Sequence, residues 1–359
     1  MANKTLELTK QLRETLKQKP DAKGLAFGTH FTDHMLVMDY TLGEGWKNPR
    51  IVPYEPITLD PAAMIFHYGQ TVFEGLKAYR TEDNRILLFR PEKNFERLNR
   101  SSERLSIPAI HEEEALNFLK ELLSVEKDWV PAEEGTSLYI RPFIIATEPN
   151  LSVAPSTTYT FLVILSPVGS YYGNGIHPVS IYVEDKFTRA VRGGTGTAKT
   201  AGNYAAAHKA QEKATEKGHA QVLWLDGIEK KYIEEVGSMN VFFKMNGEIV
   251  TPELNGSILE GITRMSIIEL LKDWGIQVSE RKLSMEELYE AHEKGELEEA
   301  FGTGTAAVIS PIGELTWKDR TISINDGQTG ELSKKLYETL TGIQTGKIAD
   351  PFNWTVEVK

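Results

Sequence analysis

The sequence predicts an α+β protein with two domains, and three observations support this prediction. The chain has 359 residues, which exceeds the roughly 250–300 residues at which a single hydrophobic core stops growing. Short apolar runs of the kind found in strands alternate with amphipathic segments of helical period. Glycine and proline concentrate in residues 166–178, which makes this stretch the best candidate linker. We therefore expect a first domain at 1–166, a linker at 167–178 and a second domain at 179–359.

The first domain is expected to begin with an amphipathic helix at residues 4–18, because three leucines recur there every four residues among charges. An aromatic-rich stretch follows at 64–79. Pro91 can occupy the first turn of a helix that runs to about Leu105, and a second helix is expected at 112–125. Four runs have the composition of strands: 35–40, 85–90, 137–146 and 158–165. Together they predict a small α/β domain.

The second domain is expected to be rich in strands, with helices on its flanks. A Gly/Thr loop is expected at 193–199 and a turn at 302–305 that leads into a strand. The other strand-like runs lie near 179–184, 220–225, 231–236, 240–245 and 276–281. The segments of helical period lie at about 203–217, 262–273 and 285–294.

Composition excludes several classes of function. The chain has 40 Lys+Arg against 51 Asp+Glu, a formal net charge of −11, and no basic run that would indicate a nucleic-acid partner. It has no cysteine, so disulfides, thiolate metal sites and thiol nucleophiles are excluded, and no metal site is expected. Residues 1–19 lack the apolar core of a secretory signal, and no window approaches a membrane span. We expect a cytoplasmic protein.

The densest motif is the run R-G-G-T-G-T-A-K-T-A-G-N-Y at residues 192–204. A nucleotide-binding P-loop would place glycine directly before the lysine, where this chain has Ala198, and backbone amides there could not wrap a phosphate as well. A second glycine pattern, at 302–307, is followed by a strand-like run rather than the helix that a dinucleotide site requires. Nucleotide binding is therefore the weaker alternative.

Lys199, held in this loop, is a candidate Schiff-base lysine, since a desolvated amine is a nucleophile. Pyridoxal phosphate also needs a carboxylate at its ring nitrogen, a donor to its ring oxygen and an anion site. Glu235, at a strand end, and Tyr204, at a helix start, supply candidates for the first two. The helix start near Gly261 and the 302–305 turn offer free amides to an anion. Each feature alone is more often a solvated or packing residue.

Seven motifs taken together resemble the branched-chain amino-acid aminotransferases, which are pyridoxal-phosphate enzymes of fold type IV. In chain order they are H-Y-G-Q-T-V-F-E-G-L-K-A-Y from His67, F-R-P-E-K-N-F-E-R-L from Phe89, Y-I-R-P from Tyr139, G-G-T-G-T-A-K-T-A-G-N-Y from Gly193, E-V-G-S-M-N from Glu235, G-I-T-R from Gly261 and F-G-T-G-T-A from Phe301. They span nearly the whole chain. The resemblance implies a D-amino-acid-aminotransferase-like fold, with a small α/β domain and a larger, strand-rich pseudo-barrel domain that carries the cofactor lysine.

The resemblance also implies a role for each matching residue. Lys199 would carry the cofactor and move the proton of the substrate α-carbon, Glu235 would pair with the pyridine nitrogen, and Tyr204 would hydrogen-bond the ring oxygen. The other positions implied for cofactor binding, mainly at its phosphate, are Arg97, Ser238, Ile262, Thr263 and Thr305. The positions implied for substrate binding are Tyr68, Tyr139, Arg141, Arg189, Thr305 and Ala306.

The implied activity is transfer of the amino group of L-leucine, L-isoleucine or L-valine to 2-oxoglutarate by a ping-pong mechanism, giving a branched-chain 2-oxo acid and L-glutamate. The resemblance implies a homodimer as well. The alternatives are a D-amino-acid aminotransferase or an aminodeoxychorismate lyase, which share only the anchor motifs. Some relatives carry a Cys-x-x-Cys pair where this chain has Ala307 and Ser310, so thiol regulation of that kind is excluded, and Ser238 stands where threonine is common.

Overall fold

The computed structural model describes residues 6–169 and 176–359, and its contacts divide the chain into two compact units. The first unit comprises Met1–Gly173, Ala198–Ala201 and Gly342–Lys359. The second comprises Asn174–Thr197 and Gly202–Thr341. The chain therefore enters the first unit three times, and the short middle segment contains Lys199.

The first unit is built on one twisted, nine-stranded sheet in the order β1-β3-β2-β8-β7-β5-β6-β18, with β4 also paired to β7. All of its pairings are antiparallel except β1 with β3. The strands are β1 (Thr9–Lys10), β2 (His34–Thr41), β3 (Gly45–Pro53), β4 (Thr71–Phe73), β5 (Leu76–Arg80), β6 (Ile86–Phe89), β7 (Ser137–Ala146), β8 (Thr158–Val168) and β18 (Thr355–Val358). The helices are α1 (Met64–Tyr68), α2 (Pro91–Arg104), α3 (Glu112–Val125) and the 3-10 turn η1 (Lys127–Trp129).

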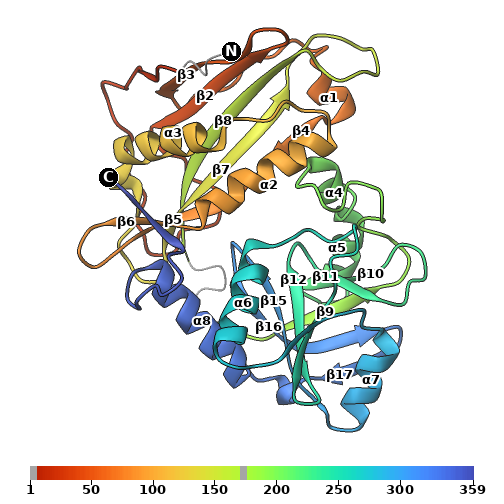
Figure 1. The fold of residues 1–359 in the computed structure, drawn as a ribbon. Helices are drawn as coiled ribbons and strands as arrows, with labels where there is room; N and C mark the ends of the chain where they lie inside the picture. Colours follow the sequence, from red (N-terminus) through yellow and green to blue (C-terminus); the bar gives the residue numbers. More distant parts are fainter. Residues whose placement is uncertain (1–5, 170–175) are drawn as a thin grey trace. The chain divides into compact units, whose positions relative to one another are not determined.

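Helices α2 and α3 lie against this sheet and bury its main core (Figure 1). Phe95 and Leu98 of α2 and Leu119 and Leu122 of α3 are at most 1% exposed, and they share one apolar cluster with residues of β2, β6, β7 and β8. Removing such side chains from water supplies most of the driving force for packing, at about 25 cal/mol per Å². The predicted helix that begins at Pro91 is confirmed.

The predicted N-terminal helix is wrong over the described residues 6–18, which are extended. Backbone amides that a helix would use internally instead donate to distant side chains: Leu6 N to Glu114 Oε1 at 2.8 Å and Arg13 N to His34 Nε2 at 2.8 Å. β1 adds a parallel pairing to β3. Leu12 and Leu16 are 50% and 60% exposed, so the leucine repeat buries no helical face. Tertiary hydrogen bonds outweigh a weak local helix preference here.

The second unit holds a mixed, nine-stranded sheet that curls into a half-barrel, in the order β11-β10-β9-β16-β15-β12-β13-β14, with β17 on β16. The strands are β9 (Val179–Glu184), β10 (Gln221–Leu225), β11 (Ile233–Val236), β12 (Asn240–Met245), β13 (Glu248–Thr251), β14 (Val278–Glu280), β15 (Leu297–Gly304), β16 (Val308–Trp317) and β17 (Arg320–Ser323). The helices are α4 (Ala201–Ala205), α5 (His208–Glu216), α6 (Ile262–Asp273), α7 (Met285–Glu293), η2 (Asn325–Gly327) and α8 (Glu331–Gln344). The expected strand-rich fold of this domain with flanking helices is confirmed. The unit is not the larger of the two, however, and Lys199 belongs to the first unit instead.

Two expectations in this unit need correction. The helix predicted at 203–217 is two helices, α4 and α5. The turn predicted at 302–305 is largely strand, because β15 runs to Gly304 and the turn follows at 305–307. Gly302 is required for close packing rather than for turning: a Cβ there would lie 2.8 Å from Val236 Cγ1 and 3.0 Å from Met239 Cε. Within this unit, β13, β17, η2 and α8 also have no counterpart among the predicted segments.

The predicted assignment of the C-terminus to the second domain is also corrected. Thr355–Val358 forms β18 and pairs with β6, and Arg90 N donates to Trp354 O at 2.7 Å, so the last residues join the first unit. Of the predicted linker 167–178, residues 170–175 lie outside the described residues. Within the described part of the chain, no helix is long and apolar enough to cross a membrane.

Helix α8 receives its N-terminal cap from Glu299 of β15. The carboxylate accepts hydrogen bonds from Leu332 N and Ser333 N, both at 3.0 Å, and from Ser333 Oγ at 2.9 Å. Glu299 is buried, and an anion at this position also opposes the positive end of the helix dipole.

We predict that Glu299→Gln lowers the free energy of unfolding by about 2 kcal/mol, because charge-assisted hydrogen bonds to two amides are weakened. Urea unfolding measures the change. The matched control is Glu298→Gln, whose side chain is 43% exposed and which should change stability by less than about 0.5 kcal/mol. Equal losses in both variants would contradict the capping role.

Candidate active site

Lys199 is fixed to the first unit by its backbone. Phe73 N donates to Lys199 O at 3.0 Å, and Lys199 N donates to Ser101 Oγ of α2 at 2.9 Å. The next residue, Thr200, forms an isolated bridge with Val72 and donates through its hydroxyl to Thr71 O at 2.7 Å. Segment 198–201 thus extends the edge of β4, and the lysine side chain leaves from a rigid backbone.

A buried ion pair lies beside this segment. Glu74 is 1% exposed, and its two oxygens accept from Arg97 Nε at 2.7 Å and Arg97 Nη2 at 2.9 Å. Asn94 Nδ2 donates to Glu74 Oε2 at 2.8 Å. Burial on its own raises the pKa of the Glu74 carboxyl, but Arg97, Lys199 and Asn94 outweigh it and the net pKa is lowered. Glu74 is therefore a buried anion that orients Arg97.

Two of the predicted residues, Lys199 and Arg141, lie against the ring of Phe73, which is part of β4, and Arg141 joins them to a third, Tyr139. Lys199 Nζ lies 5.1 Å and Arg141 Cζ lies 4.8 Å from the centre of this ring, at cation–π distances. Arg141 Nη2 donates to Tyr139 Oη at 2.9 Å. Tyr139 packs on Gly75, where a Cβ would lie 2.0 Å from the phenol oxygen. The glycine of the F-E-G motif thus makes room for the tyrosine hydroxyl.

Tyr68 has other contacts in the structure. It ends α1, is 41% exposed and donates its hydroxyl to Leu151 O. The structure therefore places the Tyr68 side chain against the 149–153 loop.

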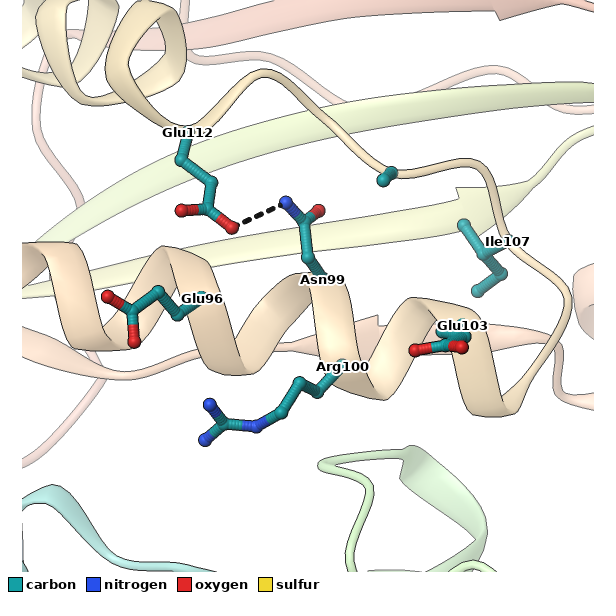
Figure 2. Close-up of a pocket in the computed structure, with 7 residues that line it drawn as sticks. Glu96, Asn99, Arg100, Glu103, Ile107 and Glu112 are labelled. Atoms are coloured by element: carbon teal, nitrogen blue, oxygen red, sulfur yellow. Dashed lines mark hydrogen bonds between the residues drawn. The ribbon is translucent and has the colours of Figure 1, made fainter.

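Helix α2 buries Arg97 beside Glu74 and leaves Arg100 exposed. Asn94, Arg97 and Ser101 lie toward β4 and Lys199, whereas Arg100 lies on a more exposed face of the helix. That face borders a shallow hollow of about 510 Å³ with Glu96, Asn99, Glu103, Ile107, Ala109 and Glu112 (Figure 2). Its charges are mixed and Asn99 Nδ2 donates to Glu112 at 3.0 Å. Arg97 is distinguished by its burial against Glu74, since Arg100 and Arg104 are exposed.

In the second unit, the two ends of the Gly/Thr loop are joined. Asn203 Nδ2 donates to Thr195 O at 2.8 Å, and Thr195 Oγ1 donates to Asn203 Oδ1 at 2.7 Å. Gly196 packs directly on the 255–259 segment, since a Cβ there would lie 2.1 Å from Ser257 O. Tyr204 follows on α4 and is half-buried. The loop on which Lys199 lies is therefore closed at its base.

Glu235 is buried at the end of β11 rather than solvated. It is 3% exposed, Oε1 accepts from Leu259 N at 2.8 Å, and Oε2 pairs with Arg189 Nε at 3.0 Å. Arg189 Nη2 donates in turn to Ser257 O at 2.5 Å. The structure thus brings the predicted Arg189 and Glu235 together. A carboxylate held in this way keeps its negative charge in a buried site.

The start of α6 is suited to an anion. Gly261 is the N-cap, and no side-chain cap bonds to the first turn, which contains Ile262 and Thr263. A Cβ on Gly261 would lie 2.0 Å from Asn240 Oδ1. Asn240 is paired with Thr303 of β15, whose buried hydroxyl has no hydrogen-bond partner among the described residues. The first-turn amides of α6, Asn240 and Thr303 thus form a group of polar atoms separate from the one around Glu235. This group begins two residues after Leu259.

The last predicted residues lie on two adjoining turns. Ser238 is exposed in the turn between β11 and β12, and Thr305 and Ala306 are half-buried in the turn after β15. The turns adjoin because a Cβ on Gly304 would lie 3.2 Å from Met239 Cγ.

Sequence reasoning missed Glu74, Phe73 and Ser101 as site residues. Glu74 carried a usable signal, since an acid inside an apolar run with no neighbouring base in sequence is expected to have a buried partner. The roles of Phe73 and Ser101 depend on tertiary contacts that no local pattern reveals. No group of three or more metal-binding side chains occurs in the described ranges, 6–169 and 176–359.

Comparison with known proteins gives a family and close relatives. The model of the family described as "Amino-transferase class IV" matches residues 71–315. Branched-chain-amino-acid aminotransferase 2 of Bacillus subtilis (strain 168) is 69% identical over 348 residues, covering 97% of this chain and 96% of its own. Branched-chain-amino-acid transaminase 1 of the same strain is 62% identical over 357 residues, covering 99% and 100%.

Solved structures of branched-chain aminotransferases have a fold similar to that of this chain. The branched-chain amino acid aminotransferase of Escherichia coli aligns with a TM-score of 0.73 at 27% identity, covering 90% of this chain and 99% of its own. The branched-chain aminotransferase of the thermophilic archaeon Thermoproteus uzoniensis, solved with norvaline, gives a TM-score of 0.74 at 28% identity, covering 91% and 100%. A further branched-chain amino acid aminotransferase, solved with pyridoxamine 5'-phosphate, gives a TM-score of 0.73 at 27% identity, covering 90% and 98%.

We predict that Glu74→Gln lowers the free energy of unfolding at neutral pH by about 3–5 kcal/mol, because it leaves the Arg97 charge buried without a counter-charge. The pKa of Glu74 is lowered below its ordinary value of 4.5. Its stabilisation is therefore present above that pH and is lost as the pH falls through the folded-state pKa. Urea unfolding of both proteins at pH 7 and at acid pH checks this.

The difference between Glu74→Gln and the parent should narrow as the solution is acidified. Glu96→Gln, on the opposite face of α2, is the matched control and should change stability by less than about 0.5 kcal/mol. A difference for Glu74→Gln that stays constant with pH would argue against a charged Glu74.

We predict that Gly196→Ala destabilises the Gly/Thr loop by about 1–3 kcal/mol, because the added methyl meets the Ser257 carbonyl at 2.1 Å. Gly202→Ala is the control, since a Cβ there has no atom within 4 Å. In α4 it should be neutral or stabilising by up to about 1 kcal/mol. Urea unfolding and proteolytic cleavage within 193–203 measure both, and equal protease sensitivity would contradict the prediction.

Proposed function

The chain belongs to the class IV amino-transferases, and we infer from this that it is a branched-chain-amino-acid transaminase that uses pyridoxal phosphate. The single observation that carries the inference is the 69% identity over 97% of the chain to a protein of that name. We propose the specific reaction to be transfer of the amino group of L-leucine, L-isoleucine or L-valine to 2-oxoglutarate. The products are a branched-chain 2-oxo acid and L-glutamate.

The residues present fit pyridoxal phosphate. The cofactor needs an anion site, and the start of α6 offers uncapped amides at Ile262 and Thr263. Near it, the Thr303 hydroxyl is buried with no hydrogen-bond partner among the described residues. The cofactor also needs a carboxylate for its pyridinium nitrogen, and Glu235 is held as a buried anion. Lys199 supplies the amine on a fixed backbone.

We propose that Lys199, Tyr204 and Glu235 hold the cofactor ring, with its phosphate held by the remaining predicted residues. Those residues are Arg97, Ile262, Thr263 and Thr305, and Ser238 is a further proposed cofactor-binding residue. When bound, pyridoxal phosphate supplies an electron sink for the negative charge that develops at the substrate α-carbon. Glu235 would keep the ring nitrogen protonated by remaining an anion, and its hydrogen bond from Leu259 N and its ion pair with Arg189 stabilise that charge.

Lys199 is proposed as the acid and base of the reaction. Its Nζ accepts the proton that leaves the substrate α-carbon and later returns one, and an amine positioned in this way contributes roughly 10²–10⁴-fold to rate. Positioning depends on the backbone and hydroxyl hydrogen bonds of residues 199 and 200. Arg141 shares the Phe73 ring with Lys199 at cation–π distance. The ring thus gives the lysine side chain a defined surface to pack against.

Substrate recognition must serve two different side chains in turn. A branched apolar chain needs an apolar wall, whereas glutamate brings a second carboxylate that needs donors. Tyr139 and Arg141 supply both, because the phenol ring is apolar and the hydroxyl and guanidinium are joined at 2.9 Å. We propose these two residues, with Tyr68, Arg189, Thr305 and Ala306, as the substrate-binding set.

We also propose a homodimer. Exposed apolar side chains gather on α1 and the 149–153 loop, which are joined by the bridge between Ala63 and Pro149. Phe66, Leu151 and Val153 are 62%, 63% and 89% exposed, and exposed apolar groups of this kind mark protein–protein contacts. Tyr68 hydrogen-bonds this loop, so a partner subunit bound here would contact a predicted substrate residue. The cytoplasmic location and the lack of a nucleic-acid partner stay predictions from composition.

The experiment that tests the function is an assay of glutamate formation from 2-oxoglutarate with L-leucine, L-isoleucine or L-valine as donor. We predict a yellow protein whose visible absorbance is lost on addition of L-leucine, and turnover that falls by at least about 10³-fold in Lys199→Ala. Lys209→Ala, with a side chain 62% exposed on α5, is the control and should keep full activity.

Turnover with D-alanine but not with L-leucine would favour the D-amino-acid aminotransferase instead. Release of pyruvate and an aminobenzoate from aminodeoxychorismate would favour the lyase. A protein that stays colourless with pyridoxal phosphate would contradict the proposed function, and nucleotide binding would then be tested.

A further inference from the structure

Two consecutive carboxylates, Glu234 and Glu235, are buried on β11, and each is 3% exposed. Side chains of neighbouring strand residues leave opposite faces of a sheet, so the two acids meet different surroundings. Glu235 is the residue proposed for the cofactor nitrogen. The proposed mechanism gives Glu234 no part. Burying a charge costs free energy unless the charge is hydrogen-bonded, so the hydrogen bonds of Glu234 indicate its role.

Glu234 holds the turn formed by residues 255–257. Its Oε1 accepts from Asn255 Nδ2 at 3.2 Å and lies within hydrogen-bond distance of Ser257 Oγ. Asn255 Oδ1 accepts from Ser257 N at 3.0 Å and lies 2.6 Å from Ser257 Oγ. Ser257 is itself buried. One carboxylate oxygen therefore fixes both side chains of the turn.

The segment 255–259 also contacts the Glu235 carboxylate, through Arg189 and through Leu259 N. Ser257 O accepts from Arg189 Nη2 at 2.5 Å, and Arg189 Nε pairs with Glu235 Oε2 at 3.0 Å. Two residues on, Leu259 N donates to Glu235 Oε1 at 2.8 Å. Gly196 of the loop that leads to Lys199 also packs on Ser257 O. Movement of Ser257 would thus disturb both partners of Glu235 and the base of the lysine loop.

We infer that Glu234 is a positioning residue that holds the segment 255–259 where it donates to and orients the Glu235 carboxylate. This inference rests on the proposed function of Glu235 toward the cofactor. Of the two Glu234 carboxylate oxygens, only Oε1 is needed to hold the turn at 255–257. Glu234 Oε2 has no hydrogen-bond partner in the described part of the chain, and Glu234 borders a hollow of about 130 Å³ that Arg192, Tyr232 and Lys282 also line. An amide oxygen at the same place can accept the same hydrogen bonds.

The test uses four variants of the full-length chain. Glu234→Ala removes the acceptor, Ser257→Ala removes the hydroxyl donor, and Glu234→Gln keeps an Oε1 acceptor without the charge. Glu229→Gln changes an exposed acid on the connection between β10 and β11 and is the matched control. For each protein we would measure the dissociation constant of pyridoxal phosphate and the pH dependence of the absorbance of the bound cofactor.

We expect Glu234→Ala and Ser257→Ala each to bind the cofactor about tenfold more weakly, which corresponds to about 1.4 kcal/mol. The midpoint of the absorbance titration should move in the same direction in both, because the charge of the cofactor ring depends on the hydrogen bonds of Glu235. The double variant should be no weaker than the weaker single variant, since both act through one interaction. Glu234→Gln and Glu229→Gln should stay within about twofold of the parent protein.

A lowered thermal unfolding midpoint in Glu234→Ala with an unchanged dissociation constant and titration would overturn the inference and leave Glu234 a purely structural residue. A loss in Glu234→Gln as large as in Glu234→Ala would also overturn it, because charge rather than acceptance would then matter. If Glu234→Ala does not fold, Ser257→Ala and Glu234→Gln carry the comparison. A parent protein that binds no pyridoxal phosphate would instead refute the proposed function.

Discussion

The first unit fixes the backbone of residues 199 and 200, and the proposed chemistry depends on this constraint. A lysine side chain has four rotatable bonds, so its amine is placed accurately only if the backbone that carries it cannot move. Here the neighbours are β4, whose Phe73 and Thr71 hydrogen-bond the segment, and α2, whose Ser101 receives the lysine amide. β4 is three residues long and is held by β7, and α2 is held by its apolar core. The large sheet and its two helices thus hold the four-residue segment 198–201 in place.

Two buried carboxylates near the predicted residues each have an opposing charge in their own unit. Glu74 receives Arg97 in the first unit, and Glu235 receives Arg189 in the second. Replacing such pairs with apolar residues often leaves stability unchanged or raises it, so stability alone does not account for them. They fix the direction of guanidinium and carboxylate groups at places where the proposed chemistry requires a charge. The two ion pairs thus define where the charges lie, even though apolar residues in their place could give equal or greater stability.

Much of the fold could be predicted from sequence because its elements have strong local signals. The apolar runs at 137–146 and 240–245 and the helical periods at 112–125 and 262–273 match β7, β12, α3 and α6 to the residue. The predictions fail where contacts with residues distant in the sequence determine the local structure. Residues 6–18 have a helical leucine spacing but give their amides to His34 and Glu114, and the glycines of β15 serve close packing rather than a turn. For the same reason, local patterns identified Lys199 and Glu235 as candidates, whereas the roles of Phe73 and Ser101 depend on contacts that form only in the folded chain.

The close packing of Met239 on β15 also determines how the protein responds to oxidants. The chain has no cysteine, so peroxide has no thiol to attack, and methionine becomes the most oxidisable side chain. Met239 is 8% exposed, and its Cε and Sδ lie 3.0 Å and 3.4 Å from the position of a Cβ on Gly302. Sulfoxide formation adds a polar oxygen to this thioether, and the contact with Gly302 leaves no room for it. Oxidation of Met239 would therefore act through the turn that carries Ser238, and methionine sulfoxide reduction, rather than thiol reduction, would reverse it.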